Sequence, residues 1–204
     1  MGKPDFTREQ ALIDQGHIVC GIDEAGRGPW AGPVVAAAVI LDGTCIPAGL
    51  NDSKKLSPAK REELFDAIMA TSRVGAGTVS VQTIDAINIL EASFRAMQDA
   101  VCALAIKPSL ALVDGNRAPH LPCEVVTLVG GDGLSLAIAA ASIIAKVTRD
   151  RIMVELDDTF PGYGFAAHKG YGTAAHAKAL QSLGPCPAHR RSFSPIRSMI
   201  LKAR

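Results

Sequence analysis

Four acidic residues stand where short apolar segments of the chain end. They are Asp23, Glu24, Asp114 and Asp132. Each follows a run of apolar residues that is typical of a buried strand. In open α/β sheets, functional groups collect near the carboxyl ends of the strands. We therefore expect the four carboxylates to converge if the strands that carry them are neighbours.

Converging carboxylates favour a divalent cation as their partner. Oxygen ligands suit Mg²⁺ or Mn²⁺, whereas zinc prefers histidine and cysteine. Two such ions, about 3.5–4 Å apart, can activate water and stabilise the leaving oxygen when a phosphodiester is cut. Neighbouring side chains of a strand, however, point to opposite faces. Asp23 and Glu24 can share a metal only if the strand bends there or one acid acts from the rim, and we assign the bridging role to Asp23.

The same residues have alternative interpretations. Each acid can simply cap a turn or a helix, and Asp114 before a glycine is a favourable turn pair. Residues 26–31, GRGPWA, also fit the G-x-G-x-x-A pattern of a dinucleotide-binding loop. That loop requires a helix after the glycines, but residues 33–41 predict a strand, and the two acids at 23–24 would repel a pyrophosphate. The dinucleotide interpretation is therefore disfavoured.

The apolar pattern predicts an α/β fold, in which a mixed sheet carries helices on its faces. The expected strands lie at residues 17–23, 33–41, 73–81, 109–113 and 125–129. The expected helices lie at about 57–70, 83–105, 134–157 and 173–183, and a basic tail follows. Alanines in the 134–157 helix would let it lie close to the sheet.

Composition and charge indicate one cytoplasmic domain. Of the 204 residues, 48% are hydrophobic but only 4% aromatic, so the core must be aliphatic and rich in alanine. The 21 basic and 20 acidic residues balance, which does not indicate a strongly basic nucleic-acid binder, although a local patch can still bind. Five cysteines without metal-binding spacing, a polar N-terminus and apolar runs too short for a bilayer predict a reduced, cytoplasmic protein without a membrane segment.

Two polar stretches are candidates for substrate contact. Lys54 and Lys55 lie in a segment that either contacts phosphate or forms a solvated turn. The segment PGYGFAAHKGYG places His168 and Lys169 among glycines and aromatic residues, so it either approaches sugars and bases or packs as a surface loop. The basic residues at 189–191 either add positive charge near such a site or keep the tail soluble.

Several motifs together resemble bacterial ribonuclease HII, the type 2 ribonuclease H. In chain order they are GIDEAGRGPWAGPVVAAAVIL, NDSKKLS, LVDGN, GGDGLSLAIAAASIIAKVTRDRIM, FPGYGFAAHKGYGT and HRRSFSP, from about residue 18 to 195. The combination of DEAGRGP with the downstream AAASIIAKVTRD is specific to this family. Trp30 and the Gly133-Leu134 pair depart from its usual pattern but remove no catalytic residue. The related type 3 enzymes differ in having a Gly-Lys-Gly loop and an extra N-terminal domain.

The resemblance implies a ribonuclease H-like, mixed five-stranded sheet flanked by helices, with a C-terminal helical extension. It implies a catalytic core at 1–158 and an extension with a substrate-binding loop at 159–204, packed as one domain. The implied enzyme is a metal-dependent endonuclease, using two Mn²⁺ or Mg²⁺ ions, that cuts the RNA strand of RNA–DNA hybrids, and we expect it to be a monomer. It would also cut 5′ of single ribonucleotides in duplex DNA, leaving 5′-phosphate and 3′-hydroxyl ends, and so help remove ribonucleotides from DNA. A non-catalytic nucleic-acid-binding module of the same fold is the alternative, which the presence of all four acids disfavours.

The resemblance also assigns roles to particular residues. The family's metal-site acids fall on the four acids described above. Its ribonucleotide-sensing Gly-Arg-Gly falls on Gly26, Arg27 and Gly28, and its sugar-stacking tyrosine falls on Tyr171. Further candidate substrate contacts are Lys54, Lys55, His168 and Lys169. The glycines would let main-chain groups approach a ribose 2′-hydroxyl, the group that distinguishes RNA from DNA.

Overall fold

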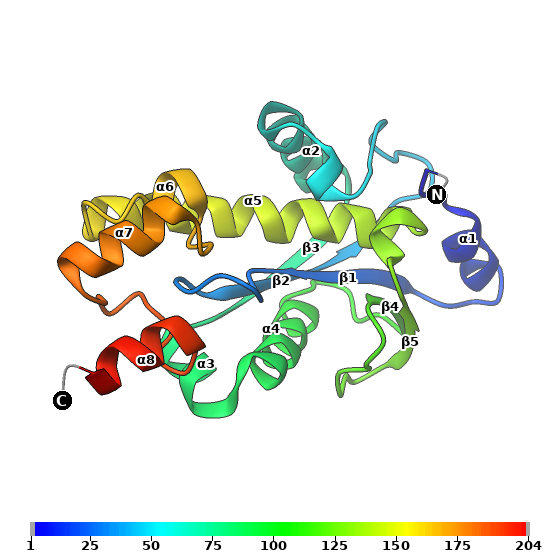
Figure 1. Ribbon diagram of the computed structural model, residues 1–204. Coiled ribbons are helices and arrows are strands. Elements are labelled where there is room, and N and C mark those ends of the chain that lie inside the picture. The colour runs from blue at the N-terminus through cyan, green and yellow to red at the C-terminus, as the bar shows by residue number, and fades with distance from the viewer. Residues whose placement is uncertain (1–2, 203–204) are drawn as a thin grey trace.

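A five-stranded mixed sheet forms the centre of the computed structural model, which describes residues 3–202 (Figure 1). The strands are β1 (Val19–Ala25), β2 (Val34–Ile40), β3 (Arg73–Val79), β4 (Leu110–Asp114) and β5 (Glu124–Leu128), in the order β3-β2-β1-β4-β5. β2 is antiparallel to both β1 and β3, whereas β1, β4 and β5 run parallel. The predicted mixed five-stranded sheet is confirmed.

Helices cover both faces of this sheet, as predicted. They are α1 (Thr7–Ile13), α2 (Pro58–Thr71), α3 (Val81–Ile87), α4 (Ile89–Cys102), α5 (Leu136–Thr159), α6 (Phe165–His168), α7 (Ala174–Leu183) and α8 (Ser194–Lys202), with 3₁₀ turns η1 (Ser53–Lys55) and η2 (Gly131–Gly133). The long α5 lies on one face and α4 on the other, while α6, α7 and α8 gather near the C-terminal half of α5 (Figure 1). None of the helices within residues 3–202 is long and apolar enough to cross a membrane.

Small residues let both covering helices approach the sheet closely. A Cβ atom added to Gly21 of β1 would lie 2.1 Å from the carbonyl carbon of Ala137 in α5. A Cβ atom added to Gly77 of β3 would lie 2.2 Å from the carbonyl oxygen of Ala96 in α4. Both distances are far too short for a side chain, so glycine is required at these crossings. The close packing predicted for the alanine-rich helix is confirmed.

The single helix predicted at 83–105 is wrong, because the structure has two helices there. Asn88 separates α3 from α4 and has a φ of 68° and a ψ of 167°, an extended positive-φ conformation that ends the first helix. Its side-chain oxygen accepts hydrogen bonds from the main-chain N–H groups of Leu90 and Glu91, at 2.9 and 3.2 Å. Asparagine is a favourable N-cap, so these two hydrogen bonds start a new helix at Ile89. The apolar periodicity continues across the break, which is why it predicted one helix.

The two ends of the described chain are also more ordered than the sequence pattern indicated. The first sixteen residues contain α1, whose buried Glu9 accepts hydrogen bonds from Ser135 Oγ and Ala137 N at 2.7 and 2.8 Å. The predicted basic tail instead enters the protein at Arg190, which is completely buried, and then forms α8. Each end is therefore hydrogen-bonded to a distant part of the chain: Glu9 to the start of α5, and Arg190 to residues 26–33.

Candidate active site at the carboxyl ends of the parallel strands

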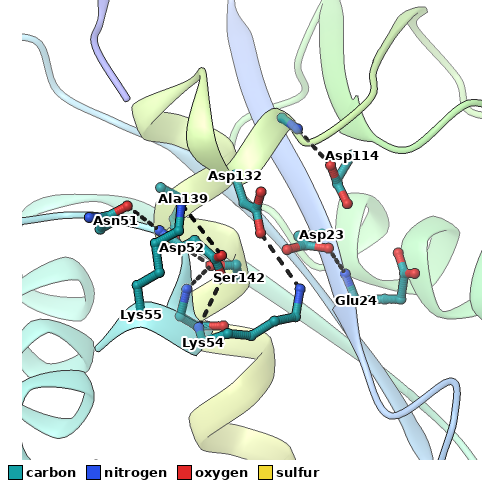
Figure 2. Close-up of polar contacts among 12 residues, drawn as sticks. Asp23, Glu24, Asn51, Asp52, Lys54, Lys55, Asp114, Asp132, Ala139 and Ser142 are labelled. Carbon is teal, nitrogen blue, oxygen red and sulfur yellow. Dashed lines mark hydrogen bonds and ion pairs between the residues drawn. The ribbon is translucent and has the colours of Figure 1, made fainter. Parts of the chain in front are cut away.

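Four carboxylates meet at one edge of the sheet. β1 and β4 are parallel neighbours in which Ile22 pairs with Val113, so Asp23 and Asp114 are the next residues along the two strands. Asp132 comes from η2, the turn between β5 and α5. Figure 2 shows the carboxylates of Asp23, Asp114 and Asp132 around one space. We refer to Asp23, Glu24, Asp114 and Asp132 as the acid cluster.

Within this cluster, Asp23 and Glu24 point to opposite faces of β1, as the period of a strand requires. Asp23 pairs with Ala37, which packs in the α5 layer, whereas Glu24 pairs with Ala36, which packs in the α4 layer. In Figure 2 the Glu24 carboxylate is directed away from Asp132. The pairing of β1 with β2 continues to the end of β1 without a break. Glu24 therefore approaches the cluster from the rim, and the strand does not bend.

Two cavities lie on either side of the end of β1. The first, of about 350 Å³, lies toward α4 and includes Glu24 and Asp114. The second, of about 250 Å³, lies toward α5 and includes Asp23, the 26–28 loop and Tyr171. Glu24 lines both cavities. The end of β1 is thus accessible from both faces, and its two acids serve different sides.

Burial and mutual repulsion make the ionised cluster unfavourable. Burial raises the pKa of Asp23 well above its ordinary value, and the charges of Glu24, Asp114 and Asp132 raise it further. Burial also raises the pKa of Glu24, against the opposing attraction of Arg27. The pKa of Asp132 is raised by burial and by nearby carboxylates. Three carboxylates therefore need added positive charge to ionise readily.

Two basic side chains supply part of that charge. Lys54 Nζ lies 3.7 Å from Asp132 Oδ2, and Figure 2 shows it reaching toward the cluster. Burial lowers the pKa of Lys54, but the surrounding carboxylates outweigh this effect and the net change is upward. Arg27 Nη1 lies 3.2 Å from Glu24 Oε1. Both basic side chains are largely exposed, so solvent screens these ion pairs.

The donor set of the cluster fits a hard divalent cation. All four side chains offer carboxylate oxygens, the ligands that Mg²⁺ and Mn²⁺ prefer. Asp114 Oδ1 accepts from Gly131 N and Asp23 Oδ1 accepts from Glu24 N, each at 2.7 Å, so each bond engages one carboxylate oxygen. Among residues 3–202, no three His, Cys, Asp or Glu side chains already stand in a metal-ligating arrangement. The chemistry of the cluster therefore fits the cation, and its side chains must adjust to hold it.

A second region beside the cluster is built from three segments that are distant in sequence, residues 26–33, 168–171 and 186–190. We call it the loop junction. Trp30 N donates to Gly170 O at 2.8 Å, Gly32 N donates to Ala188 O at 2.9 Å, and Arg190 N donates to Trp30 O at 2.8 Å. Main-chain hydrogen bonds thus join the 26–33 segment, which begins with Gly-Arg-Gly, to both of the others.

The side chain of Arg190 is central to the loop junction. Its Nη1 donates to Arg27 O and its Nε donates to Gly32 O, each at 2.9 Å. Its Nη2 donates to Gly26 O and, at 3.1 Å, to Pro33 O. Burial, and then the charge of Arg149, lower the pKa of Arg190 to about 9. One buried guanidinium therefore satisfies four carbonyl groups of the loop that begins with Gly-Arg-Gly.

Arg149 of α5 also donates hydrogen bonds to carbonyl groups of the loop junction. Its Nε donates to Pro33 O at 2.9 Å, and its Nη2 donates to Ala31 O at 3.0 Å. Its Nη1 donates to Lys169 O at 3.0 Å. In the described part of the chain, neither Arg149 nor Arg190 forms an ion pair with a carboxylate. The loop junction is therefore held by charge-assisted hydrogen bonds to carbonyl oxygens.

Tyr171 and the Gly-Arg-Gly segment lie side by side. A Cβ atom added to Gly28 would lie 3.9 Å from Tyr171 Cε1. Gly26 has a φ of 99°, and a Cβ atom there would lie 2.1 Å from Arg149 Nε. Glycine is thus needed at position 26 for both its conformation and its close neighbour. The ring of Tyr171 is 47% exposed, so one of its faces is available beside this segment.

The other predicted substrate contacts, Lys55, His168 and Lys169, have side chains directed away from the acid cluster or bonded within the protein. Lys55 Nζ is 3.9 Å from Asp52 Oδ2, and Figure 2 shows Lys55 pointing away from the acid cluster. His168 Nε2 lies 2.8 Å from Tyr163 O, which turns this ring toward the protein. Lys169 Nζ donates to the main-chain oxygen of Ala166. The structure therefore brings Lys54 to the acids but does not bring the other three side chains there.

Residues of α5 that the sequence analysis did not single out also line the cavity beside Asp23. They are Ser142, Lys146 and Arg149. Their spacing of four and three residues places them on one face of the helix, among alanine and isoleucine. Polar residues at helical spacing within AAASIIAKVTRD are the signal that could have identified this face.

Comparisons with known proteins agree with the architecture and with the motifs. Residues 20–196 match the sequence model of the family described as Ribonuclease HII. Ribonuclease HII of Parvibaculum lavamentivorans is 55% identical over 97% of this chain and 74% of its own length. Ribonuclease HII of Azorhizobium caulinodans is 57% identical over 96% of this chain and 76% of its own.

Solved structures of ribonuclease H2, HII and HIII proteins are similar to this fold. Ribonuclease H2 from Pyrococcus horikoshii superposes with a TM-score of 0.75 at 29% identity, covering 90% of this chain and 97% of its own. RNase HII from Archaeoglobus fulgidus, solved in complex with PCNA, has a TM-score of 0.74 at 31% identity, covering 86% and 95%. Bst-RNase HIII in complex with Mn²⁺, at 20% identity and a TM-score of 0.67, shares the fold.

Proposed function

The chain belongs to the ribonuclease HII family, and from this membership we propose that it also cuts duplex DNA at single embedded ribonucleotides. The family accounts for endonuclease activity of the ribonuclease H type on RNA–DNA hybrids and for dependence on a divalent metal. In our proposal the cut falls 5′ of the ribonucleotide and leaves 5′-phosphate and 3′-hydroxyl ends. The protein would thereby help to remove ribonucleotides from DNA.

We assign the chemistry to the acid cluster. Asp23 is buried, and the carboxylates of Asp114 and Asp132 lie around the same space (Figure 2). This crowding of carboxylates, which raises the pKa of Asp23, is the observation that carries the assignment. Crowded, pKa-shifted carboxylates mark functional sites more often than structural ones. In this proposal Asp23, Asp114 and Asp132 hold the metal, and Glu24 contributes from the α4 side. The alternative of a non-catalytic binding module has no support, because the chain retains all four acids.

We propose that two Mn²⁺ or Mg²⁺ ions are held during the reaction. When bound, such ions supply Lewis-acid chemistry, because they lower the pKa of water and stabilise a departing oxygen. The carboxylates orient that centre, while Lys54 adds positive charge near Asp132 for the substrate phosphate. The acid cluster and the loop junction both come from a single chain, which supports a monomer as the active form.

We assign discrimination between ribose and deoxyribose to the loop junction. Phosphate contacts are the same along the whole strand, so they cannot report a single 2′-hydroxyl. The main chain of Gly26-Arg27-Gly28 lines the cavity that contains Asp23, and Arg190 fixes its carbonyl groups. Tyr171 lies beside Gly28 and would stack on the adjacent sugar. Main-chain groups would then read the 2′-hydroxyl at a fixed distance from the acids.

The decisive experiment uses a labelled DNA duplex with one central ribonucleotide. The protein is incubated with it in Mn²⁺, in Mg²⁺ and in excess chelator, and the product ends are mapped. We expect one cut on the 5′ side of the ribonucleotide, with a 3′-hydroxyl on the upstream product, in either metal but not in chelator.

An all-DNA duplex of the same sequence and a continuous RNA–DNA hybrid are the controls. Cleavage of the hybrid without cleavage at the single ribonucleotide would refute the proposed specificity and leave the family activity intact. Full cleavage in chelator would refute the metal assignment.

A further inference from the structure

A group of histidines lies behind Tyr171, on the inner side of the loop junction. His176 of α7 and His189 are buried, with 0% and 1% of their surface exposed. His176 stacks on His168 at a centroid distance of 4.4 Å, and aromatic rings of Tyr163 and Phe165 complete the group. None of these histidines contacts the acid cluster through a hydrogen bond or ion pair in the described structure, so the group has no role in the proposed chemistry.

Three close contacts join the two buried rings to each other and to main-chain groups at either end. His176 Nδ1 lies 2.9 Å from the carbonyl oxygen of Tyr171. His176 Nε2 lies 3.0 Å from His189 Nε2. His189 Nδ1 lies 3.0 Å from the main-chain N–H of Cys186. The contacts form a continuous chain from Cys186 through both rings to Tyr171.

Hydrogen-bond chemistry determines where each proton lies in this chain. A carbonyl oxygen only accepts, so His176 must carry its proton on Nδ1, and its Nε2 is then an acceptor. His189 meets that acceptor by donating through Nε2–H, which makes its Nδ1 an acceptor for the Cys186 N–H. Every donor meets an acceptor when both rings are neutral. His189 Nδ1 also lies 3.3 Å from Cys186 O, so His189 could carry its proton there instead. A proton added to either ring would place two N–H groups opposite each other, either between His176 and His189 or between His189 Nδ1 and the Cys186 N–H.

The surroundings keep the rings neutral. Burial lowers the pKa of His176, and burial together with His176 lowers the pKa of His189 to about 4. The titratable groups around the pair are His168, the Tyr163 phenol and the Cys186 thiol. Burial raises the pKa of Tyr163 and of Cys186, so neither offers negative charge at neutral pH.

The Tyr171 ring depends on its backbone for its orientation. The N–H of Tyr171 donates to His168 O at 3.0 Å, and its carbonyl accepts from Thr173 N at 2.8 Å as well as from His176. The ring itself is half-exposed and rests beside Gly28. A peptide unit held on both sides fixes the direction of the Cα–Cβ bond, and therefore fixes where the ring lies.

We propose that His176 and His189 are positioning residues, a relay of fixed tautomers that orients Tyr171 and so sharpens discrimination of the ribo-to-deoxyribo step. The proposal rests on the stacking role assigned to Tyr171 under the proposed function. The relay runs in one direction, from the Cys186 N–H to the Tyr171 carbonyl. It predicts the less common Nδ1–H tautomer for His176 and the Nε2–H tautomer for His189.

The tautomers can be measured without any substrate. In ¹⁵N-histidine-labelled protein at pH 7, long-range ¹H–¹⁵N spectra distinguish Nδ1–H, Nε2–H and doubly protonated rings, and single substitutions assign the signals. We expect a neutral Nδ1–H ring for His176 and a neutral Nε2–H ring for His189. A charged ring at either position, or an Nε2–H tautomer for His176, would overturn the relay.

A matched pair of variants tests the consequence for recognition. In His189→Gln the amide nitrogen replaces Nε2 as a donor to His176, whereas His189→Phe keeps a ring without any nitrogen. The measured quantity is kcat/KM on a single-ribonucleotide duplex divided by kcat/KM on a continuous hybrid, since the acid cluster serves both substrates. We expect His189→Phe to lower this ratio about tenfold, as for one lost hydrogen bond, and His189→Gln to hold it within about twofold.

Each other outcome contradicts a specific part of the argument. Equal losses on both substrates, or equal ratios for the two variants, would show that His189 is merely structural and would overturn the positioning role. Failure of the wild type to cut a single ribonucleotide would refute the proposed function. In that case the spectra still decide whether the relay exists, so the two failures are distinguishable.

Discussion

The acid cluster and the loop junction lie side by side but are stabilised in opposite ways. In the acid cluster, like charges are crowded and the pKa of Asp23 is raised by burial and by its neighbours. In the loop junction, Arg149 and Arg190 donate seven hydrogen bonds to carbonyl groups and form no ion pair with a carboxylate in the described structure. One region is left in need of a ligand, whereas the other is already satisfied.

This difference matches the tasks proposed for the two regions. A metal site must bind strongly, and unfavourable repulsion among its ligands is relieved when positive charge arrives. A site that reads one hydroxyl must have fixed main-chain positions before the substrate arrives, because ordering it afterwards would weaken discrimination. We therefore expect substitutions in the acid cluster to separate activity from stability, and substitutions in the loop junction to damage both.

The largest effect is expected for Asp23→Asn. It removes one anionic oxygen ligand without changing the shape of the side chain. Loss of several kcal/mol of transition-state stabilisation corresponds to a decrease in kcat of about a thousandfold or more. Single-turnover cleavage of a hybrid substrate measures it, and duplex binding is measured in parallel. Binding should persist, and full activity in this variant would contradict the assignment of Asp23.

The same substitution should stabilise the metal-free fold at neutral pH. Because the pKa of Asp23 is raised on folding, the folded protein binds this proton more tightly, and ionisation lowers the free energy of unfolding as pH rises. Urea unfolding in chelator should therefore show Asp23→Asn more stable than the wild type at pH 7, with a difference that shrinks toward about pH 4. Asp158→Asn, at an exposed position of α5, is the control and should show neither effect.

The contrasting substitution is Arg190→Met in the loop junction. It leaves the carbonyls of Gly26, Arg27 and Gly32 without their buried donor, while Pro33 O keeps its hydrogen bond from Arg149. We therefore expect the free energy of unfolding to fall by about 3–5 kcal/mol. The neighbouring Arg191 has an exposed side chain, and Arg191→Met should change stability by less than about 0.5 kcal/mol. Urea unfolding of both variants provides the comparison. Equal effects would mean that the buried guanidinium does not hold the loop.

An intermediate effect is expected at Tyr171. Its ring, and not its hydroxyl, does the stacking in our proposal, so Tyr171→Ala should lose about ten- to a hundredfold in kcat/KM on a single-ribonucleotide duplex. Tyr171→Phe should stay close to the wild type. Equal impairment of the two variants would assign the effect to the hydroxyl, and no impairment in either would place junction sensing elsewhere.

The smallest expected effect is a change in KM, and it should differ between the two neighbouring lysines. Lys54 reaches the acid cluster, whereas Lys55 turns toward Asp52. Lys54→Gln should raise KM on a hybrid substrate by up to about fivefold, the value of one exposed ionic contact, and Lys55→Gln should have no measurable effect. Steady-state kinetics at low salt measure both. A larger effect of Lys55→Gln would show that the substrate path follows the other side of η1.

The sequence could predict the features that depend on local pattern. Short apolar runs located the strands, and acids after three of these runs marked the edge at which the carboxylates meet. Local pattern failed where a single polar residue overrode it, as at Asn88, which divides the predicted helix in two. It also failed for α1, because the anchor of that helix is Glu9 buried against α5, 126 residues away.

The sequence by itself therefore determined which groups could do chemistry, the strands that carry them and the glycines that allow close approach. The tertiary structure alone decided that Asp23 and Glu24 serve opposite faces of β1, and that Arg190 belongs to the Gly-Arg-Gly segment 164 residues before it. It also decided that His176 and His189 meet behind Tyr171. The physical reason is that charge, burial and protonation depend on neighbours in space, and segments so far apart become neighbours only when the chain folds.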